Sequence, residues 1–140
     1  MLATVALSQI DGAAYNAVIF VGGNGAHSFY EDEDAHRVAR QAAAGVGVLA
    51  AICIAPGILA RAGVLSGRHA TVNASEAKAL VAAGAAVAHT SVVTDGKLVT
   101  ADGPHAAHEF AMAILRAATP RLARTTRSMR PPSKPSPPSE

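Results

Sequence analysis

The fold of this chain is decided by residues 46–56, Val46-Gly47-Val48-Leu49-Ala50-Ala51-Ile52-Cys53-Ile54-Ala55-Pro56. The uncharged, apolar run up to Ile52 is typical of a parallel strand that is buried on both faces. The next apolar residues recur at helical spacing, and they are Ile54, Ile58, Leu59 and Ala62. Gly63 is expected to end this helix. The only cysteine, Cys53, therefore lies where a strand turns into a helix, and α/β enzymes place nucleophiles at such junctions.

The predicted position of Cys53 favours a reactive thiol. A side chain at the start of a helix faces unpaired backbone N–H groups and the positive end of the helix dipole. Both stabilise a thiolate, which is the nucleophilic form of cysteine. The alternative is a cysteine that is buried only for packing. The rest of the chain has to decide between the two.

The composition indicates one domain. The chain has 140 residues and half of them are apolar, which is enough to form a core. One cysteine excludes an internal disulfide, and no basic segment precedes the apolar N-terminal residues as in a secretory signal, so we expect a cytoplasmic protein. Residues 41–60 carry no charge, but glycines and a proline interrupt them, so we expect a strand and a helix there and no membrane span.

Charge and proline are unevenly distributed. Residues 120–140 carry five basic residues and one acidic residue, whereas residues 1–119 carry seven basic and nine acidic residues. The net charge of +2 therefore indicates no basic face on the domain, and we expect no nucleic-acid partner. Six of the eight prolines also lie in residues 120–140. We predict an α/β domain over residues 1–119 and a disordered Pro/Ser/Arg-rich tail over residues 120–140.

Strand and helix patterns alternate along the domain. In order, they predict a strand at 16–21, a helix from 31–34 onward, the strand and helix around Cys53, a strand at 69–72, a helix at 75–83, a β-hairpin at 92–100 and a helix after Pro104. The hairpin is expected to close through a two-residue Asp95-Gly96 turn. This order favours a doubly wound α/β sandwich with a mostly parallel sheet, in which ligands bind at the carboxyl ends of the strands.

A glycine turn, Gly22-Gly23-Asn24-Gly25, ends the first of these strands. It lacks the third glycine of GxGxxG and four carboxylates follow it, so a dinucleotide site is disfavoured. We interpret its N–H groups as facing Cys53 and forming an oxyanion hole with the N–H of Ile54. The alternative is a plain turn between a strand and a helix.

The histidines do not single out a base for Cys53. His105 and His108 have a spacing that could share a metal, but no third ligand and no HExxH pattern accompany them, so no metal site is predicted. His69, at a strand start, could face the Cys53 site or lie at the surface. A cysteine hydrolase normally needs a histidine to accept the thiol proton.

Five segments, in order, resemble the ThiJ/PfpI family. They lie at residues 15–23, 51–56, 59–68, 94–100 and 103–111, within a match that covers residues 13–118. The resemblance implies a flavodoxin-like sandwich that is usually a homodimer and needs no cofactor. Members of the family are described as deglycases, glyoxalases that act without glutathione, intracellular peptidases or redox-responsive chaperones.

The resemblance also implies roles for particular residues. Cys53 matches the nucleophile, the N–H groups of Gly23 and Ile54 match the oxyanion hole, and Gly22 lies beside them. We expect a cysteine-dependent lyase or hydrolase that acts on a small carbonyl compound or adduct, assembles as a homo-oligomer and holds no metal. The alternatives are a non-catalytic or truncated member with a redox-responsive or chaperone role in stress, and a binding module that acts through the tail.

The chain departs from the family pattern in three places. Members carry a histidine either directly after the cysteine, where this chain has Ile54, or on the following strand, at the place of Asn73. They also begin with a strand, a helix and a strand, and a glutamate from this region contacts the cysteine. From the resemblance we expect this chain to start too late to contain that region. In the flavodoxin-like order the first of these strands pairs with residues 17–21. We therefore expect residues 17–21 to form an exposed sheet edge that lowers stability or pairs with another chain, with residues 1–7 as partial cover.

Overall fold

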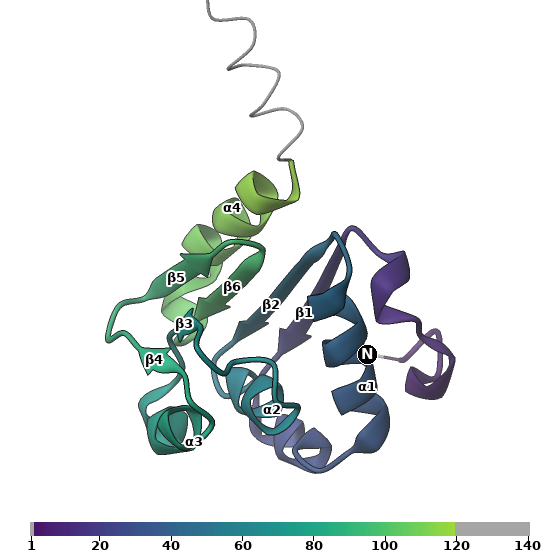
Figure 1. Ribbon diagram of the computed structural model, residues 1–140, viewed down its shortest axis with the longest axis horizontal. Helices are drawn as coiled ribbons and strands as arrows, with labels where there is room; N and C mark the ends of the chain where they lie inside the picture. The colour runs from purple at the N-terminus through teal and green to yellow at the C-terminus, as the bar shows by residue number, and fades with distance from the viewer. Residues whose placement is uncertain (1, 120–140) are drawn as a thin grey trace, which may run out of the picture.

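The protein is described by a computed structural model over residues 2–119, and the tail predicted at 120–140 lies outside the described residues. Four strands form the main sheet in the order β1-β2-β6-β5 (Figure 1). They are β1 (Ala17–Val21), β2 (Val48–Ile52), β5 (Val92–Asp95) and β6 (Leu98–Ala101). The first three strands of this order are parallel, and β5 runs antiparallel to β6. A second, two-stranded parallel pair contains β3 (His69–Ala70) and β4 (Ala86–Val87).

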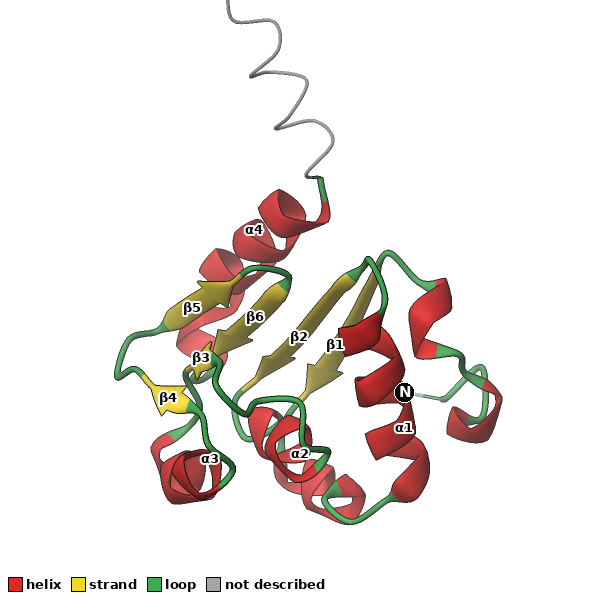
Figure 2. Cartoon of the chain, in the orientation of Figure 1, coloured by secondary structure: helices red, strands yellow, loops and turns green. Residues whose placement is uncertain are grey.

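Helices cover both faces of the main sheet (Figure 2). They are α1 (Glu33–Ala44), α2 (Pro56–Arg61) and α4 (Ala107–Ala118), while α3 (Ala77–Ala82) packs against α2 and β4. Five short 3₁₀ helices link them, at Leu7–Gln9, Gly12–Ala14, Asn24–Phe29, Ala74–Glu76 and Pro104–Ala106. One apolar core joins α1 and α2 to one face of the sheet, and a second core joins α4 to the other face. The predicted α/β sandwich with a mostly parallel sheet is confirmed.

Strand β2 is the centre of the sheet, as its apolar sequence predicts. All five of its residues are buried, and it pairs with β1 on one side and β6 on the other. Leu49 and Ala51 belong to the core under α1, whereas Val48, Ala50 and Ile52 belong to the core under α4. Because alternate side chains fill both cores, no position in this strand tolerates a charge.

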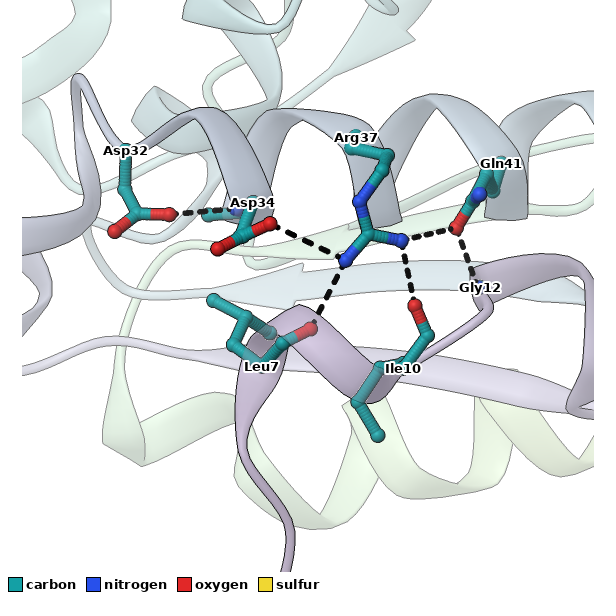
Figure 3. A network of polar contacts seen from close by, with 8 residues as sticks. Leu7, Ile10, Gly12, Asp32, Asp34, Arg37 and Gln41 are labelled. Atoms are coloured by element: carbon teal, nitrogen blue, oxygen red, sulfur yellow. Dashed lines mark hydrogen bonds and ion pairs between the residues drawn. The ribbon is translucent and has the colours of Figure 1, made fainter.

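The segment before β1 is anchored to α1 and not to the sheet. The Arg37 guanidinium donates hydrogen bonds to the carbonyl oxygens of Ile10 at 2.6 Å and Leu7 at 3.0 Å (Figure 3). The Gln41 side-chain oxygen accepts hydrogen bonds from the Gly12 N–H at 2.9 Å and from Arg37 at 3.0 Å. Strand β1 is an edge strand of the described sheet, as predicted, and residues 2–7 add no strand to it.

Four predicted boundaries were wrong in detail. The strand predicted at 69–72 covers only His69–Ala70. The hairpin pairs Asp95 with Leu98, so its two central residues are Gly96 and Lys97, and Gly96 has the positive φ, +63°, of a primed turn. The helix after Cys53 begins only at Pro56 and ends at Arg61. The helix predicted at 75–83 is shortened because residues 74–76 form a 3₁₀ turn, which the Asn73 side chain caps.

Asp95 is held at the hairpin by contacts that the turn sequence does not reveal. Its carboxylate accepts a hydrogen bond from the His69 N–H at 2.8 Å and another from the Arg68 side chain at 3.3 Å. The hydrogen bond from His69, together with the charge and hydrogen bond of Arg68, holds the pKa of Asp95 below its usual value. These bonds join the short β3 strand to the main sheet.

Candidate active site

Cys53 occupies a strained turn directly after β2. Its φ is +68°, the one positive φ among the non-glycine residues of the described chain. Such a conformation costs an L-residue about 1–3 kcal/mol and persists only where the surroundings enforce it. Here the Cys53 N–H donates to the carbonyl of Ala101 at 3.0 Å, and the Cys53 carbonyl accepts from the Asn73 N–H at 2.8 Å. The backbone on both sides of the thiol is thus fixed by neighbouring strand ends, which is the geometry of a nucleophile elbow.

The glycine turn after β1 touches this elbow through backbone atoms. The Gly22 N–H donates to the carbonyl of Ile52 at 3.2 Å. A Cβ atom placed on Gly22 would lie 2.7 Å from that carbonyl oxygen and 2.8 Å from the Ile54 nitrogen. Only glycine allows this approach, since both neighbours are backbone atoms. The structure therefore brings together Gly22, Gly23, Cys53 and Ile54, which the sequence analysis grouped.

Two backbone N–H groups at this contact have no hydrogen-bond acceptor within residues 2–119. They belong to Gly23 and Ile54, neither of which lies inside a helix or strand. Ile54 is buried, with 8% of its surface exposed. Free amide donors beside a nucleophile can stabilise the negative oxygen that develops when the nucleophile attacks a carbonyl group. The arrangement fits the oxyanion hole expected from the sequence.

A polar cluster that the sequence analysis missed lies against the first turn of α2. The buried Tyr30 hydroxyl donates to the Ile54 carbonyl at 3.4 Å, and the Arg61 guanidinium stacks 4.0 Å from the Tyr30 ring centroid. Arg61 also donates to the Gly57 carbonyl at 2.9 Å and to the Glu76 carboxylate at 3.3 Å. A Cβ atom on Gly57 would lie 2.9 Å from that carboxylate and 3.2 Å from the Tyr30 hydroxyl. Through the Tyr30 hydrogen bond to the Ile54 carbonyl, the cluster holds the backbone that follows Cys53 in place.

The Tyr30 hydroxyl is kept neutral by its surroundings. Burial raises the pKa of Tyr30 to about 12, the negative charge of Glu76 adds to the rise, and the positive charge of Arg61 opposes it. At neutral pH the phenol is therefore protonated. It can donate a hydrogen bond but cannot accept the thiol proton of Cys53.

Among the described residues no hydrogen bond or ion pair joins a histidine to Cys53. His27 and His36 instead hydrogen-bond to the carbonyl oxygens of Asn24 at 3.0 Å and Tyr30 at 2.6 Å. Asn73, at the place where family members carry a histidine, uses its side-chain oxygen to accept from the Ser75 N–H at 3.1 Å. His69 is largely exposed and faces Asp95 at 3.6 Å, and His105 faces Asp102 at 3.0 Å. Within residues 2–119, no group of three His, Cys, Asp or Glu side chains lies close enough to hold a metal ion. No helix in this part of the chain is long and apolar enough to cross a membrane.

A groove of about 800 Å³ runs along the β1 edge and ends at this site. Gly22 and Gly23 line its end, but Cys53 and Ile54 do not. The groove therefore reaches the glycine turn, but Cys53 does not line it.

Comparisons with known proteins cover nearly all of the described residues. Residues 1–117 match the sequence profile of the DJ-1/PfpI family. Protein dj-1beta of Drosophila melanogaster is 36% identical over 115 residues, which make up 81% of this chain and 62% of that protein. An uncharacterized protein of Methanocaldococcus jannaschii is 37% identical over 106 residues, 74% of this chain and 52% of that protein. The chain thus spans less than two thirds of these relatives.

Solved structures give the same result for the fold. The crystal structure of Drosophila melanogaster DJ-1beta superposes with a TM-score of 0.74 at 31% identity, covering 92% of this chain and 71% of that one. A ThiJ/PfpI domain protein from Brachyspira murdochii gives a TM-score of 0.76 at 27% identity, covering 79% of this chain and 64% of that one. The predicted flavodoxin-like fold is confirmed.

Proposed function

Because the chain belongs to the DJ-1/PfpI family, we propose that Cys53 is the nucleophile of an enzyme that acts on small carbonyl compounds or their adducts. The observation that carries the proposal is the strained elbow at Cys53 beside two free amide donors. A cysteine buried only for packing would need neither the left-handed backbone nor the glycine contact. A deglycase or glyoxalase reaction that needs no cofactor fits this geometry.

The first step of the proposed reaction is addition of the thiolate to the carbonyl carbon. A C–S bond forms, and the π electron pair of the carbonyl group moves to its oxygen. The N–H groups of Gly23 and Ile54 then donate hydrogen bonds to this oxyanion, where each donor is worth about 3–4 kcal/mol in comparable enzymes. A proton from water then converts the oxyanion to a neutral hemithioacetal, which balances the proton that Cys53 gave to water when it formed the thiolate.

The backbone N–H groups nearest to Cys53 contribute more to stabilising the thiolate and the oxyanion than the dipole of helix α2 does. Helix α2 has only six residues, so its dipole is smaller than that of the longer helix expected from the sequence. Stabilisation of the thiolate and of the oxyanion then depends on the nearest N–H groups. Their positions are set by the Gly22 contact and by the Tyr30 hydrogen bond to the Ile54 carbonyl.

The test is consumption of methylglyoxal without glutathione by the wild type and by Cys53→Ser. Serine keeps the size of the side chain but is a far weaker nucleophile, so we expect the rate to fall to the uncatalysed level. Circular dichroism of both proteins checks that the fold is retained. Equal rates of methylglyoxal consumption by the two folded proteins would contradict the proposal.

A second candidate is a thiol that responds to oxidants without turning over a carbonyl substrate. It is favoured by the lack of any histidine contact to Cys53 among the described residues. Reaction of the protein with hydrogen peroxide, followed by mass spectrometry of the Cys53 peptide, separates the two. Rapid oxidation together with no consumption of methylglyoxal would favour this candidate over the enzyme.

A further inference from the structure

Cys53 and Asp102 lie opposite each other at the carboxyl ends of two neighbouring strands. Strands β2 and β6 run parallel and side by side (Figure 1), and their register pairs Ile52 with Ala101. The ladder continues beyond this pair, because the Cys53 N–H donates to the Ala101 carbonyl at 3.0 Å. The next pair in the register is Cys53 and Asp102. The backbone of Asp102 therefore lies one strand spacing, about 4.8 Å, from that of Cys53.

The carboxylate of Asp102 has an oxygen that the main chain and the core leave unused. This atom, Oδ1, is shielded from solvent and accepts no hydrogen bond of good geometry within residues 2–119. Its ion-pair contact among these residues is with the His105 ring, whose Nε2 lies 3.0 Å away. A carboxylate placed in this way orients an imidazole ring and stabilises the imidazolium that forms when the ring accepts a proton.

The turn after β6 brings the His105 ring back to Asp102. Residues Pro104–Ala106 form a 3₁₀ helix, and side chains three residues apart lie on the same side of such a turn. The ring packs over bare backbone, since a Cβ atom on Gly103 would lie 3.2 Å from its Nδ1 and Cε1 atoms. The contact with Asp102 occupies Nε2 and leaves Nδ1 as the nitrogen that can accept a proton. The His105 side chain is 65% exposed, so water reaches it.

We propose that His105, held by Asp102, accepts the proton of the Cys53 thiol through one water molecule and returns it to the oxyanion. In the first transfer the S–H bond breaks, its electron pair stays on sulfur, and Nδ1 of the ring gains the proton. In the second transfer, after the C–S bond has formed, the ring gives this proton to the negative oxygen and is neutral again. His105 thereby replaces bulk water as the proton carrier. The second transfer rests on the proposed carbonyl addition, whereas the first does not.

The position of His105 differs from that of the other histidine that faces a carboxylate. His69 lies 3.6 Å from Asp95, and Asp95 pairs with Leu98 at the start of β6. In the parallel register the start of β6 lies beside the start of β2, so the length of β6, roughly 13 Å, separates this contact from Cys53. The register therefore favours His105 over His69 as the partner of the thiol.

The first test compares the rates at which iodoacetamide alkylates Cys53 at pH 7 in the wild type, His105→Gln and His69→Gln. Glutamine keeps a polar side chain but accepts no proton, and His69 is a matched control because it is also exposed and faces a carboxylate. An ordinary thiol is only a few per cent ionised at pH 7. We expect His105→Gln to slow alkylation about tenfold or more and His69→Gln to leave it unchanged. Circular dichroism checks that both variants are folded.

The second test measures methylglyoxal consumption by the same proteins. We expect His105→Gln to lower kcat about 100-fold or more with little change in KM, because general acid–base catalysis contributes at least this much. Free imidazole at constant pH should restore part of the rate of His105→Gly, which a structural role of the ring would not allow. Asp102→Asn should lower kcat in the wild type but not further in His105→Gln, because Asp102 acts through the ring.

The two readouts separate this proposal from the proposed function. Equal alkylation rates of the wild type and the folded His105→Gln protein would overturn the proposal, whether or not the chain consumes methylglyoxal. No response of His105→Gly to imidazole, in a protein whose turnover depends on Cys53, would overturn it as well. If Cys53→Ser and the wild type consume methylglyoxal equally but His105→Gln still slows alkylation, the proposed function fails and the first proton transfer stands.

Discussion

Replacing Gly22 with alanine adds one methyl group at the contact between the glycine turn and the elbow. The new Cβ would lie 2.7 Å from the Ile52 oxygen, 2.8 Å from the Ile54 nitrogen and 3.0 Å from the Ala55 nitrogen, whereas ordinary contacts begin at 3.4 Å. All three atoms belong to the backbone, so no side-chain rotation can relieve the clash. The two segments must separate by several tenths of an ångström, and overpacking of this kind costs about 1–3 kcal/mol.

The separation also moves the Ile54 N–H relative to the thiol. Oxyanion donors act over a narrow range of distances, so we expect Gly22→Ala to slow methylglyoxal consumption as well as to destabilise the fold. Urea unfolding followed by circular dichroism gives the loss of stability, and the rate is measured where both proteins are folded.

Gly25→Ala is the matched control for this substitution. A Cβ atom on Gly25 has nothing within 4 Å, and its φ is not positive. We expect its stability to change by less than about 0.5 kcal/mol and its rate to stay that of the wild type. If the two variants unfold at the same urea concentration and turn over at the same rate, the described contact does not exist.

Three further substitutions test the forces at the Cys53 site and at the hairpin. The wild type should lose about 2 kcal/mol of stability between pH 10 and pH 12, because Tyr30 ionises near 10 when unfolded and near 12 when folded. Tyr30→Phe should lack this loss in alkaline urea unfolding, and an identical profile for the two proteins would contradict the burial of the Tyr30 hydroxyl. Asp95→Asn should destabilise the chain by about 1 kcal/mol at pH 7. Because the folded pKa of Asp95 is depressed, that difference should vanish as the pH falls below the folded value, and a difference that stays constant down to acid unfolding would contradict it. Cys53→Gly should be about 1 kcal/mol more stable than Cys53→Ala in the same assay, since only glycine relieves the positive φ, and the reverse order would show that the turn is unstrained.

The parts of the fold that the sequence predicts are those with a strong local pattern. Strand β2 is recognisable because a central parallel strand must be apolar on both faces, and Cys53 follows it directly. The exposure of β1 was predicted from the order of strands in the family. The proposed oxyanion donors could be named from the sequence because they are backbone groups next to residues that the family resemblance had already marked.

The polar cluster at Tyr30, Arg61 and Glu76 could not be predicted in this way. Its members come from three segments and meet only because Gly57 leaves room between them; no spacing in the sequence links them. The register of the hairpin was missed for a similar reason, since the contacts of Asp95 with Arg68 and His69 come from a distant strand.

The central claim, that Cys53 performs carbonyl chemistry, is tested most directly by graded alkylation of the protein. Because the chain has one thiol, treatment with limiting iodoacetamide modifies only Cys53, and mass spectrometry gives the modified fraction. The rate of methylglyoxal consumption is then measured for each sample. We predict that the rate falls in direct proportion to the modified fraction and reaches the uncatalysed level at full modification. A fully alkylated protein that keeps its activity would contradict the claim.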